Sequence, residues 1–275
     1  MIERKEDGAT EVLFDSVVEI ENAEFANKLN ERNQKDSERR GDDIDWWGVR
    51  GGYNEVKKLV ACGWNDGMEK ALTALHTLNI PRLKTMRRRK VRSDFGDHLD
   101  MQAVYGGNLD RAWESTHREA GVMQQGQTVT LAVDLGANCD VEAGRMFWRG
   151  AAATVLCDEL QKSGRNVRVV GYSVSDAFNS SRELKCVMVV LKDYQDALDM
   201  NSLIVTTALS GFFRSYIFKA KRLGSRTIKD SLGRHNGSYK PAMLEEESDV
   251  VYIKNVWDRY AAQELLIRVG EQING

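Results

Sequence analysis

The sequence predicts a mixed α/β protein, in which a sheet containing a βαβ unit is flanked by helices, with a mostly helical extension at the N-terminus. Residues 129–133, 167–172 and 184–191 are expected to be strands, because each is a short run rich in valine and other apolar residues. Residues 146–161 follow the first strand as a long apolar helix that stops before Gly164. A strand, a helix and a strand in close succession require a parallel pair.

The N-terminal region is expected to be mostly helical. Apolar positions between residues 12 and 20 suggest a short strand, and a helix fits residues 21–33. Between residues 46 and 79, apolar side chains recur at helical spacing. Gly63 and Gly67 interrupt this pattern, which predicts either two helices or one kinked helix.

Pro81 and Pro241 are the only prolines, so the chain has few recognisable linkers. We divide it into a mostly helical region of residues 1–80, an α/β core with the basic segments over residues 81–240, and a C-terminal strand and helix in residues 241–275. One continuous domain is equally compatible with the sequence. The remaining expected elements are helices over 108–119 and 195–209, a strand at 250–254 and a helix at 256–270.

The composition indicates a protein of a reducing, aqueous compartment, and we expect it in the cytoplasm. Hydrophobic residues make up 42% of the 275 residues, and no run of about 18 apolar residues could span a membrane. The charged N-terminus lacks the apolar stretch of a signal peptide. No cysteine belongs to a CxxC pair or has a zinc-ligand spacing, so neither disulfides nor a metal site is expected at Cys62, Cys139, Cys157 and Cys186.

Positive charge is concentrated in two segments, although the net charge is only −2. Between residues 82 and 93 there are seven basic residues and no acidic one: Arg82, Lys84, Arg87, Arg88, Arg89, Lys90 and Arg92. Between residues 214 and 240 there are eight, against the single Asp230. Because the local field decides what binds, a near-neutral chain with such segments can still bind a polyanion.

The second basic segment also carries aromatic residues, and stacking on aromatics contributes about 1–3 kcal/mol per base in single-strand binding. If the segment is extended, one face presents Phe212, Arg214, Tyr216 and Phe218, and the basic residues continue with Lys219, Lys221, Arg222 and Arg226. A half-buried strand with a solvated basic end explains the aromatic pattern equally well. The neighbouring basic residues favour single-stranded nucleic acid as the partner.

Two acidic motifs are candidates for metal chemistry. The strand followed by Asp134-x-Gly136-x-Asn138 resembles the metal-binding turn of von Willebrand A domains, but Gly136 supplies no ligand, so a turn-capping role for Asp134 is favoured. The cluster Asp94, Asp97, His98 and Asp100 could serve a metal nuclease, although a structural turn is the favoured interpretation.

No recognised catalytic motif is present. The chain lacks G-x-S-x-G, H-E-x-x-H, a Walker A motif and G-x-G-x-x-G. We therefore expect a binding protein without a cofactor rather than an enzyme. A protein-interaction module on a degenerate von Willebrand A-like core, using the Asp134 edge of the sheet, stays open as the alternative to nucleic-acid binding.

Several short motifs resemble a domain of uncertain function in tailed bacteriophages. The similarity covers most of residues 46–220 and includes Trp46-Trp47-Gly48, Gly51-Gly52-Tyr53, Gly63-Trp64, Gly106-Gly107-Asn108 and Arg149-Gly150-Ala151-Ala152. Within such proteins the resemblance extends to single-stranded DNA-binding replication cofactors and transcription regulators (Drc). It implies an early phage protein in the host cytoplasm, with single-stranded DNA, the phage RNA polymerase and further copies of itself as partners.

Overall fold

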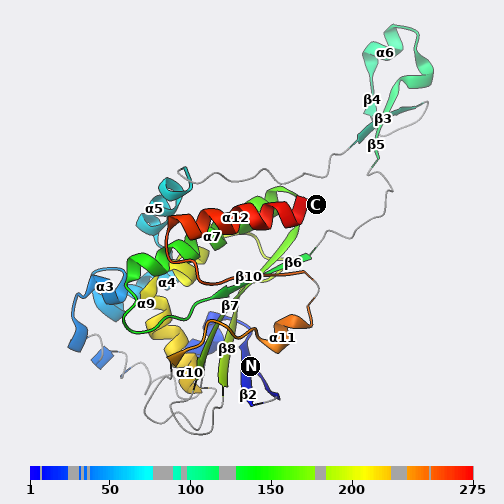
Figure 1. Cartoon of the computed structure of the whole chain (residues 1–275). Helices are drawn as coiled ribbons and strands as arrows, with labels where there is room; N and C mark the ends of the chain where they lie inside the picture. Colours follow the sequence, from blue (N-terminus) through cyan, green and yellow to red (C-terminus); the bar gives the residue numbers. More distant parts are fainter. Residues whose placement is uncertain are drawn as a thin grey trace.

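The computed structural model describes residues 1–6, 8–23, 31, 34–35, 38–76, 89–93, 98–117, 128–176, 184–223, 234–247 and 249–274. These residues form a seven-stranded sheet with flanking helices and, apart from it, a small three-stranded sheet (Figure 1). The mixed α/β class predicted from the sequence is confirmed.

The centre of the large sheet is built around β6. Along the sheet the strands lie in the order β1 (Ile2–Glu6), β2 (Ala9–Phe14), β8 (Leu184–Lys192), β7 (Asn166–Asp176), β6 (Thr128–Asp134) and β10 (Val250–Ile253), and β9 (Arg234–His235) pairs with β7. β6 is parallel to both of its neighbours, β7 and β10. β8 is antiparallel to β7, and β2 is parallel to β8. One sheet thus takes strands from residues 1–80, 81–240 and 241–275.

Helix α7 (Ala143–Lys162) connects β6 to β7 and confirms the predicted βαβ unit. A Cβ atom on Gly150 would lie 2.3 Å from the backbone N of Ala208, the last residue of α8 (Met200–Ala208). The glycine therefore allows the two helices to approach closely. After α7, Gly164 has a φ of 91°, as expected for a glycine that ends a helix.

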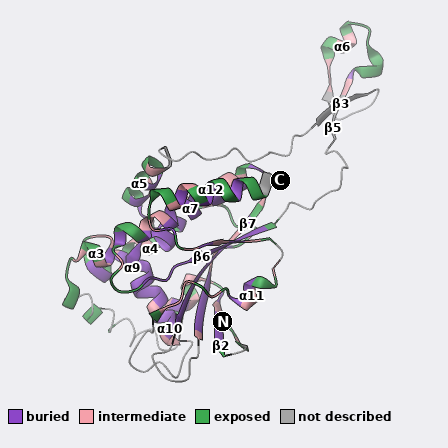
Figure 2. Ribbon diagram, viewed as in Figure 1, coloured by how far each residue is buried: buried purple, intermediate pink, exposed green. Residues whose placement is uncertain are grey.

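Helices lie on both faces of the sheet, and Figure 2 shows the buried interior. Helix α12 (Arg259–Asn274) packs beside α7 on one face, and α11 (Ala242–Glu245) covers part of the other, where Leu244 is buried. Glu11 of β2 anchors α11, because its carboxylate accepts hydrogen bonds from Tyr239 Oη and from the backbone N atoms of Ala242 and Met243. None of the helices in the described residues has the length and apolar character needed to cross a bilayer.

The N-terminal region folds into the short helices α1 (Val17–Asn22) and α3 (Ile44–Trp47) and the longer α4 (Gly52–Cys62) and α5 (Asn65–His76). Two separate helices, α4 and α5, lie on either side of Gly63, which is one of the two alternatives predicted from the sequence. The first helix begins earlier than residue 21, because Ser16 caps it by accepting a hydrogen bond from the backbone N of Glu19. Residues 24–30 lie outside the described part of the chain.

The small sheet comprises β3 (Arg89–Ser93), β5 (Trp113–His117) and β4 (His98–Leu99), with α6 (Met101–Tyr105) and the 3₁₀ turn η1 (Leu109–Arg111) between β4 and β5. The extended conformation predicted for the basic run is confirmed for residues 89–93. The helix predicted over 108–119 is wrong, because η1 is a single turn and β5 pairs with both β3 and β4. Trp113 and Thr116 belong to the residue types that favour strands.

Residues 210–223 are helical, which corrects the extended conformation expected for the aromatic and basic segment. α9 (Ser210–Phe212), a π-helical turn (Phe213–Ile217) and α10 (Phe218–Leu223) follow one another directly. Phe212 and Tyr216 are four residues apart, and their rings stack with centroids 5.1 Å apart. Helical spacing brings such a pair together, whereas the alternation of an extended chain separates it.

Candidate functional site

The parallel strands β6 and β10 have their carboxyl ends at the same end of the sheet. The chain continues from β6 to β7 on one side, while β10 lies on the other side of β6, so the strand order reverses at β6. In open α/β sheets, ligand sites lie outside the carboxyl ends of the strands at such a reversal. Asp134 is the last residue of β6 and therefore lies where such a ligand site is expected.

Asp134 is fully buried, and both of its oxygens face protein groups. Oδ1 accepts a hydrogen bond from the backbone N of Gly136 at 2.9 Å, which confirms the predicted turn-capping role. Oδ2 lies 3.1 Å from Nε2 of His235, and the two groups form an ion pair when the imidazole is protonated. Nδ1 of the same ring lies 3.2 Å from the carbonyl oxygen of Val174.

The turn after β6 does not offer the ligands of a hard cation. Gly136 has no side chain, and a Cβ atom there would lie 2.1 Å from Nδ1 of His235, so the imidazole fills that space. The side-chain oxygen of Asn138 accepts a hydrogen bond from the backbone N of His235. Asp134 and Asn138 thus hold His235, and a divalent ion that needs about six oxygen ligands does not fit these residues.

A buried arginine lies next to the same turn. Arg149 of α7 is fully buried and donates a hydrogen bond from Nη1 to the carbonyl oxygen of Gly136 at 2.9 Å. Its guanidinium carbon lies 5.1 Å from the centroid of the Trp257 ring. Burial lowers the pKa of Arg149, while the charge of Asp134 opposes this shift. Asp134 therefore serves as the counter-charge of a buried cation.

A serine, a histidine and an aspartate border this turn without the geometry of a catalytic triad. A Cβ atom on Gly136 would lie 2.8 Å from Oγ of Ser173 as well as close to His235. However, one ring nitrogen of His235 faces Val174 and the other faces Asp134, so neither is left to activate the serine. Ser173 is also fully buried, out of reach of a substrate. The contacts of His235 with Asp134 and Val174 are therefore structural.

The aromatic residues predicted to stack on bases lie in the core. Phe212 and Tyr216 have exposed fractions of 0% and 3%, and Phe218 is half-buried, with its ring 5.0 Å from that of Phe213. The hydroxyl of Tyr216 donates a hydrogen bond to the carboxylate of Glu21. In this conformation the rings are packed against protein, and base stacking by them stays a prediction that the fold does not support.

The basic residues of the same segment make internal contacts. Arg214 donates to the carbonyl oxygens of Asp45, Trp46 and Val141, and burial lowers its pKa to about 10. Lys219 donates to the carbonyl oxygen of Glu21 at 3.2 Å.

Lys221 is buried as well, and burial lowers its pKa to about 8. Arg222 is half-buried, and Arg226 lies outside the described residues. The helical path turns most of the basic residues described in this segment towards the protein.

The other predicted residues fall on the small sheet or beyond the described residues. Arg89, Lys90 and Arg92 belong to β3, whereas Arg82, Lys84, Arg87 and Arg88 lie outside the described part. Of the acidic cluster, Asp94 and Asp97 are likewise outside it, and His98 belongs to β4. Asp100 caps α6 by accepting hydrogen bonds from the backbone N atoms of Gln102 and Ala103, which is the structural role that its motif favoured.

His235 and Arg149 were not selected from the sequence. His235 follows a glycine-containing basic stretch without a motif, and its contact with Asp134 depends on the pairing of β9 with β7. For Arg149 a signal was available, since a lone arginine within the apolar run of a buried helix requires a partner.

The chain belongs to a family defined by a domain of unknown function (DUF7192), whose model matches residues 6–274. No curated protein and no solved structure matches the chain.

Proposed function

We propose that this protein is a non-catalytic protein-interaction module built on a degenerate von Willebrand A-like core. The succession of β6, the Asp134 turn, α7 and the parallel β7, with β10 on the far side of β6, supports that comparison. In this proposal the imidazole of His235 takes the place of an ion beside Asp134. Partner binding is accordingly independent of divalent cations.

The observation that carries the proposal is the contrast between the two edges of the large sheet. β1 has the sequence IERKE, and charged residues of this kind protect an edge against pairing with other chains. β10 has the sequence VVYI and no charge, and within the described residues no strand pairs with its outer side. An apolar, unprotected edge strand is a surface to which another polypeptide can bind.

Selection from a random-peptide display library tests the proposal. We expect peptides to be enriched on the intact protein, and their affinity, measured by fluorescence polarisation, to be the same in magnesium and in EDTA. Failure to enrich any peptide, together with tight binding of a single-stranded oligonucleotide, would contradict it.

Single-stranded nucleic-acid binding is the second candidate, and the basic run of residues 82–93 favours it. In this proposal an early phage protein acts in the host cytoplasm, in replication or as a regulator of the phage RNA polymerase, as a homo-oligomer. Arg89, Lys90 and Arg92 belong to a strand of the small sheet, which stands apart from the large one (Figure 1). Phosphate contacts of such a strand would supply affinity without sequence preference.

A further inference from the structure

Among the described residues, no strand pairs with the backbone groups on the outer side of β10. The backbone N of Thr130 in β6 donates a hydrogen bond to the carbonyl oxygen of Asp249. Successive residues of a strand direct their backbone groups to alternate sides, so residues 249, 251 and 253 face β6. The N–H and C=O groups of Val250 and Tyr252 therefore point to the open side, where no described strand pairs with them. This spacing is the one that an added strand requires.

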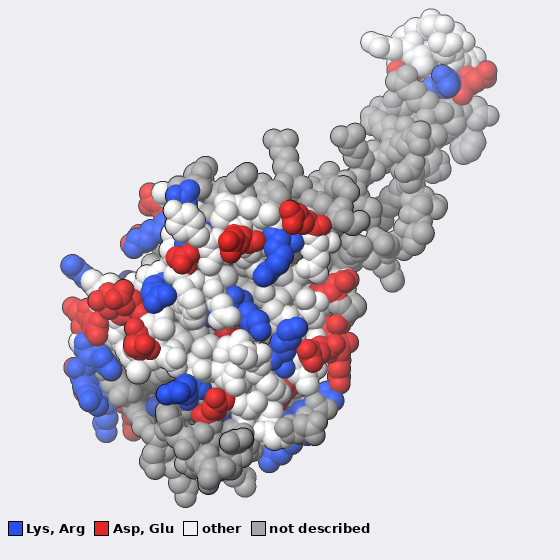
Figure 3. Space-filling view, in the orientation of Figure 1, with Lys and Arg blue, Asp and Glu red and all other residues white. Residues whose placement is uncertain are grey.

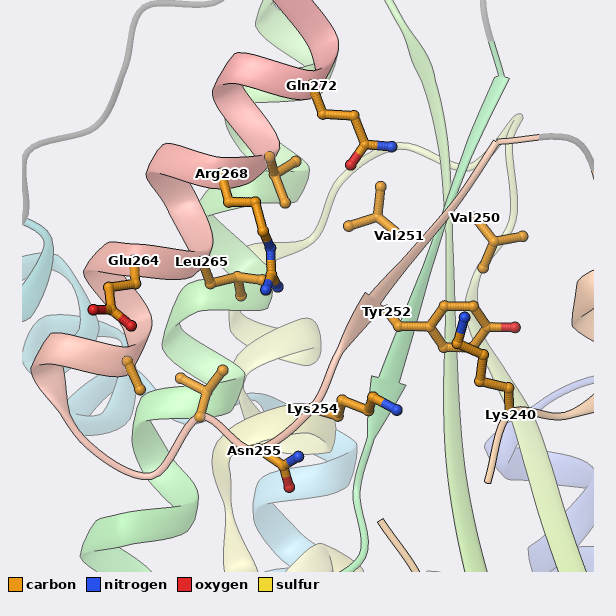
Figure 4. A pocket seen from close by; sticks show the side chains of 13 residues that line it. Lys240, Val250, Val251, Tyr252, Lys254, Asn255, Glu264, Leu265, Arg268 and Gln272 are labelled. Carbon is orange, nitrogen blue, oxygen red and sulfur yellow. The ribbon is translucent and has the colours of Figure 1, made fainter. Parts of the chain in front are cut away.

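A groove of about 420 Å³ runs between this open side and helix α12. The residues that define this β10–α12 groove include Val251, Tyr252, Lys254, Leu265, Arg268 and Val269. Figure 4 shows Val251, Leu265 and Arg268 on the α12 side of the strand and Tyr252 with Lys240 on the other. Val251, Leu265 and Val269 belong to the core, so the apolar surface that the groove exposes comes from the half-buried Val250, Tyr252 and Ala261.

The charge of the groove is predominantly positive. Lys240, Lys254 and Arg268 line it, against one carboxylate, Glu264. Figure 3 shows basic and acidic side chains interspersed on the face of the molecule that it draws. Nζ of Lys240 lies 5.0 Å from the centroid of the Tyr252 ring, which fixes one of these charges at the strand. An occupant with carboxylates would complement these cations.

We infer that the β10–α12 groove binds an extended acidic segment of a partner protein, which joins the large sheet as a strand next to β10. Backbone hydrogen bonds to Val250 and Tyr252 hold the segment, and its apolar side chains contact the half-buried Val250, Tyr252 and Ala261. Its acidic side chains lie towards Lys254 and Arg268. The inference rests on the proposed function and specifies the partner and the mode of binding.

Fluorescence polarisation with the intact protein tests the mode of binding. The probe is a labelled decapeptide of alternating valine and threonine with two glutamates at one end, compared with versions that carry glutamine or lysine there. We expect the acidic peptide to bind about tenfold more tightly than the lysine version at low salt. N-methylation of alternate amides should weaken binding about tenfold in one register and leave it nearly unchanged in the other, because only one set of amides faces β10.

Two variants test the location. Val250→Pro removes an outward N–H, and proline is tolerated at the first residue of an edge strand, so the fold should survive while peptide affinity falls. Lys254→Glu combined with Arg268→Glu should reverse the preference between the acidic and lysine peptides. Lys70→Glu combined with Arg145→Glu, at exposed positions elsewhere, is the matched control and should leave the preference unchanged.

Three outcomes would overturn the inference. Equal effects of N-methylation in both registers would exclude strand addition, and displacement of the acidic peptide by a single-stranded oligonucleotide would assign the groove to nucleic acid. If peptides obtained by display bind the native protein, the Val250→Pro variant and the charge-reversal variant with equal affinity, the proposed function stands but the β10–α12 groove is not the docking site.

Discussion

Nε2 of His235 lies 3.1 Å from Oδ2 of Asp134, so a side chain from a distant part of the sequence is seated against the last residue of β6. The contact fixes the segment after β9 to the carboxyl edge of the sheet. A Cβ atom on Gly237 would lie 3.3 Å from Oδ1 of Asn255, so the same segment passes close to the end of β10. The carboxylate of Asp134 thus contacts His235 of β9 and provides the counter-charge of the buried Arg149.

Asp134→Ala should destabilise the protein by about 3 kcal/mol, because it leaves Arg149 as a buried charge without its counter-charge. The turn also loses the hydrogen bond from Gly136 to Asp134. Urea unfolding followed by circular dichroism measures the loss. Asp140→Ala, at an exposed position in the same loop, is the control and should change stability by less than about 0.5 kcal/mol. Equal stability of the two variants would contradict the role of Asp134.

Magnesium should leave the thermal unfolding midpoint unchanged. A ligand present at 100 times its Kd stabilises the folded state by about 2.7 kcal/mol, which would raise the midpoint by several degrees. Because His235 and Gly136 use both oxygens of Asp134, we expect no such rise in differential scanning fluorimetry with magnesium or manganese at millimolar concentration. A rise that Asp134→Asn abolishes would show that an ion displaces His235.

Two glycines of α7 should respond oppositely to alanine. Gly150→Ala should cost about 2 kcal/mol or more, because the added Cβ meets the backbone of Ala208. Gly144→Ala meets no atom within 4 Å and should stabilise the protein by up to about 0.5 kcal/mol, since alanine favours the helix. Urea unfolding of both variants measures the difference. A neutral Gly150→Ala would mean that α7 and α8 separate without cost.

The central elements could be predicted because their local patterns have one interpretation. Residues 128–134 and 166–176 form valine-rich strands on either side of a long apolar helix, which is the pattern of a βαβ unit. Residues 210–223 illustrate the opposite case. Phe212 and Tyr216, four residues apart, satisfy both the alternation of a strand and the spacing of a helix. Packing of Phe212 on Tyr216 and burial against the core decided for the helix.

The candidate site could be predicted only in part. Asp134 was recognised because it ends a strand, and its Asx-type turn depends on residues next to it in the chain. The β10–α12 groove was not recognised, because an edge strand is defined by the absence of a neighbour and not by its own sequence. The same holds for His235, whose position follows from the pairing of Ser175 with His235 across β7 and β9.

Lys221 should make stability depend on pH between about 8 and 10.5. Burial lowers its pKa from 10.5 to about 8, so the folded state releases this proton before the unfolded state does as the pH rises. The unfolded state then binds more protons, and the contribution of Lys221 to stability rises with pH across this window, by roughly 3 kcal/mol in total. Below pH 8 both states are protonated, and the full cost of burying the charge is present.

Lys221→Met removes this contribution without leaving a cavity. Another buried group changes stability over an overlapping pH range. Burial raises the pKa of Cys157 to about 12, so stability falls as the cysteine of the unfolded state ionises. The difference between the native protein and the variant isolates Lys221. We expect urea unfolding to show a stability advantage of the variant at pH 7.5 that shrinks by pH 9.5. A pH-independent difference would show that Lys221 is not buried as a cation. Lys162→Met, at an exposed position, is the control.

The basic run of residues 82–93 allows the second candidate function to be tested separately from the fold. Replacing Arg87, Arg88 and Arg89 together by alanine should weaken binding of a single-stranded oligonucleotide. It should also flatten the salt dependence of the affinity by about 0.7 in log–log slope for each lost phosphate contact. A gel shift across a salt titration measures both.

The matched control replaces Lys57, Lys58 and Lys70, at exposed positions on α4 and α5. Phe212 and Tyr216 are not replaced, because removal of their buried rings would open the core. Equal affinity and slope for both triple variants and the native protein would remove the basic run from any nucleic-acid site.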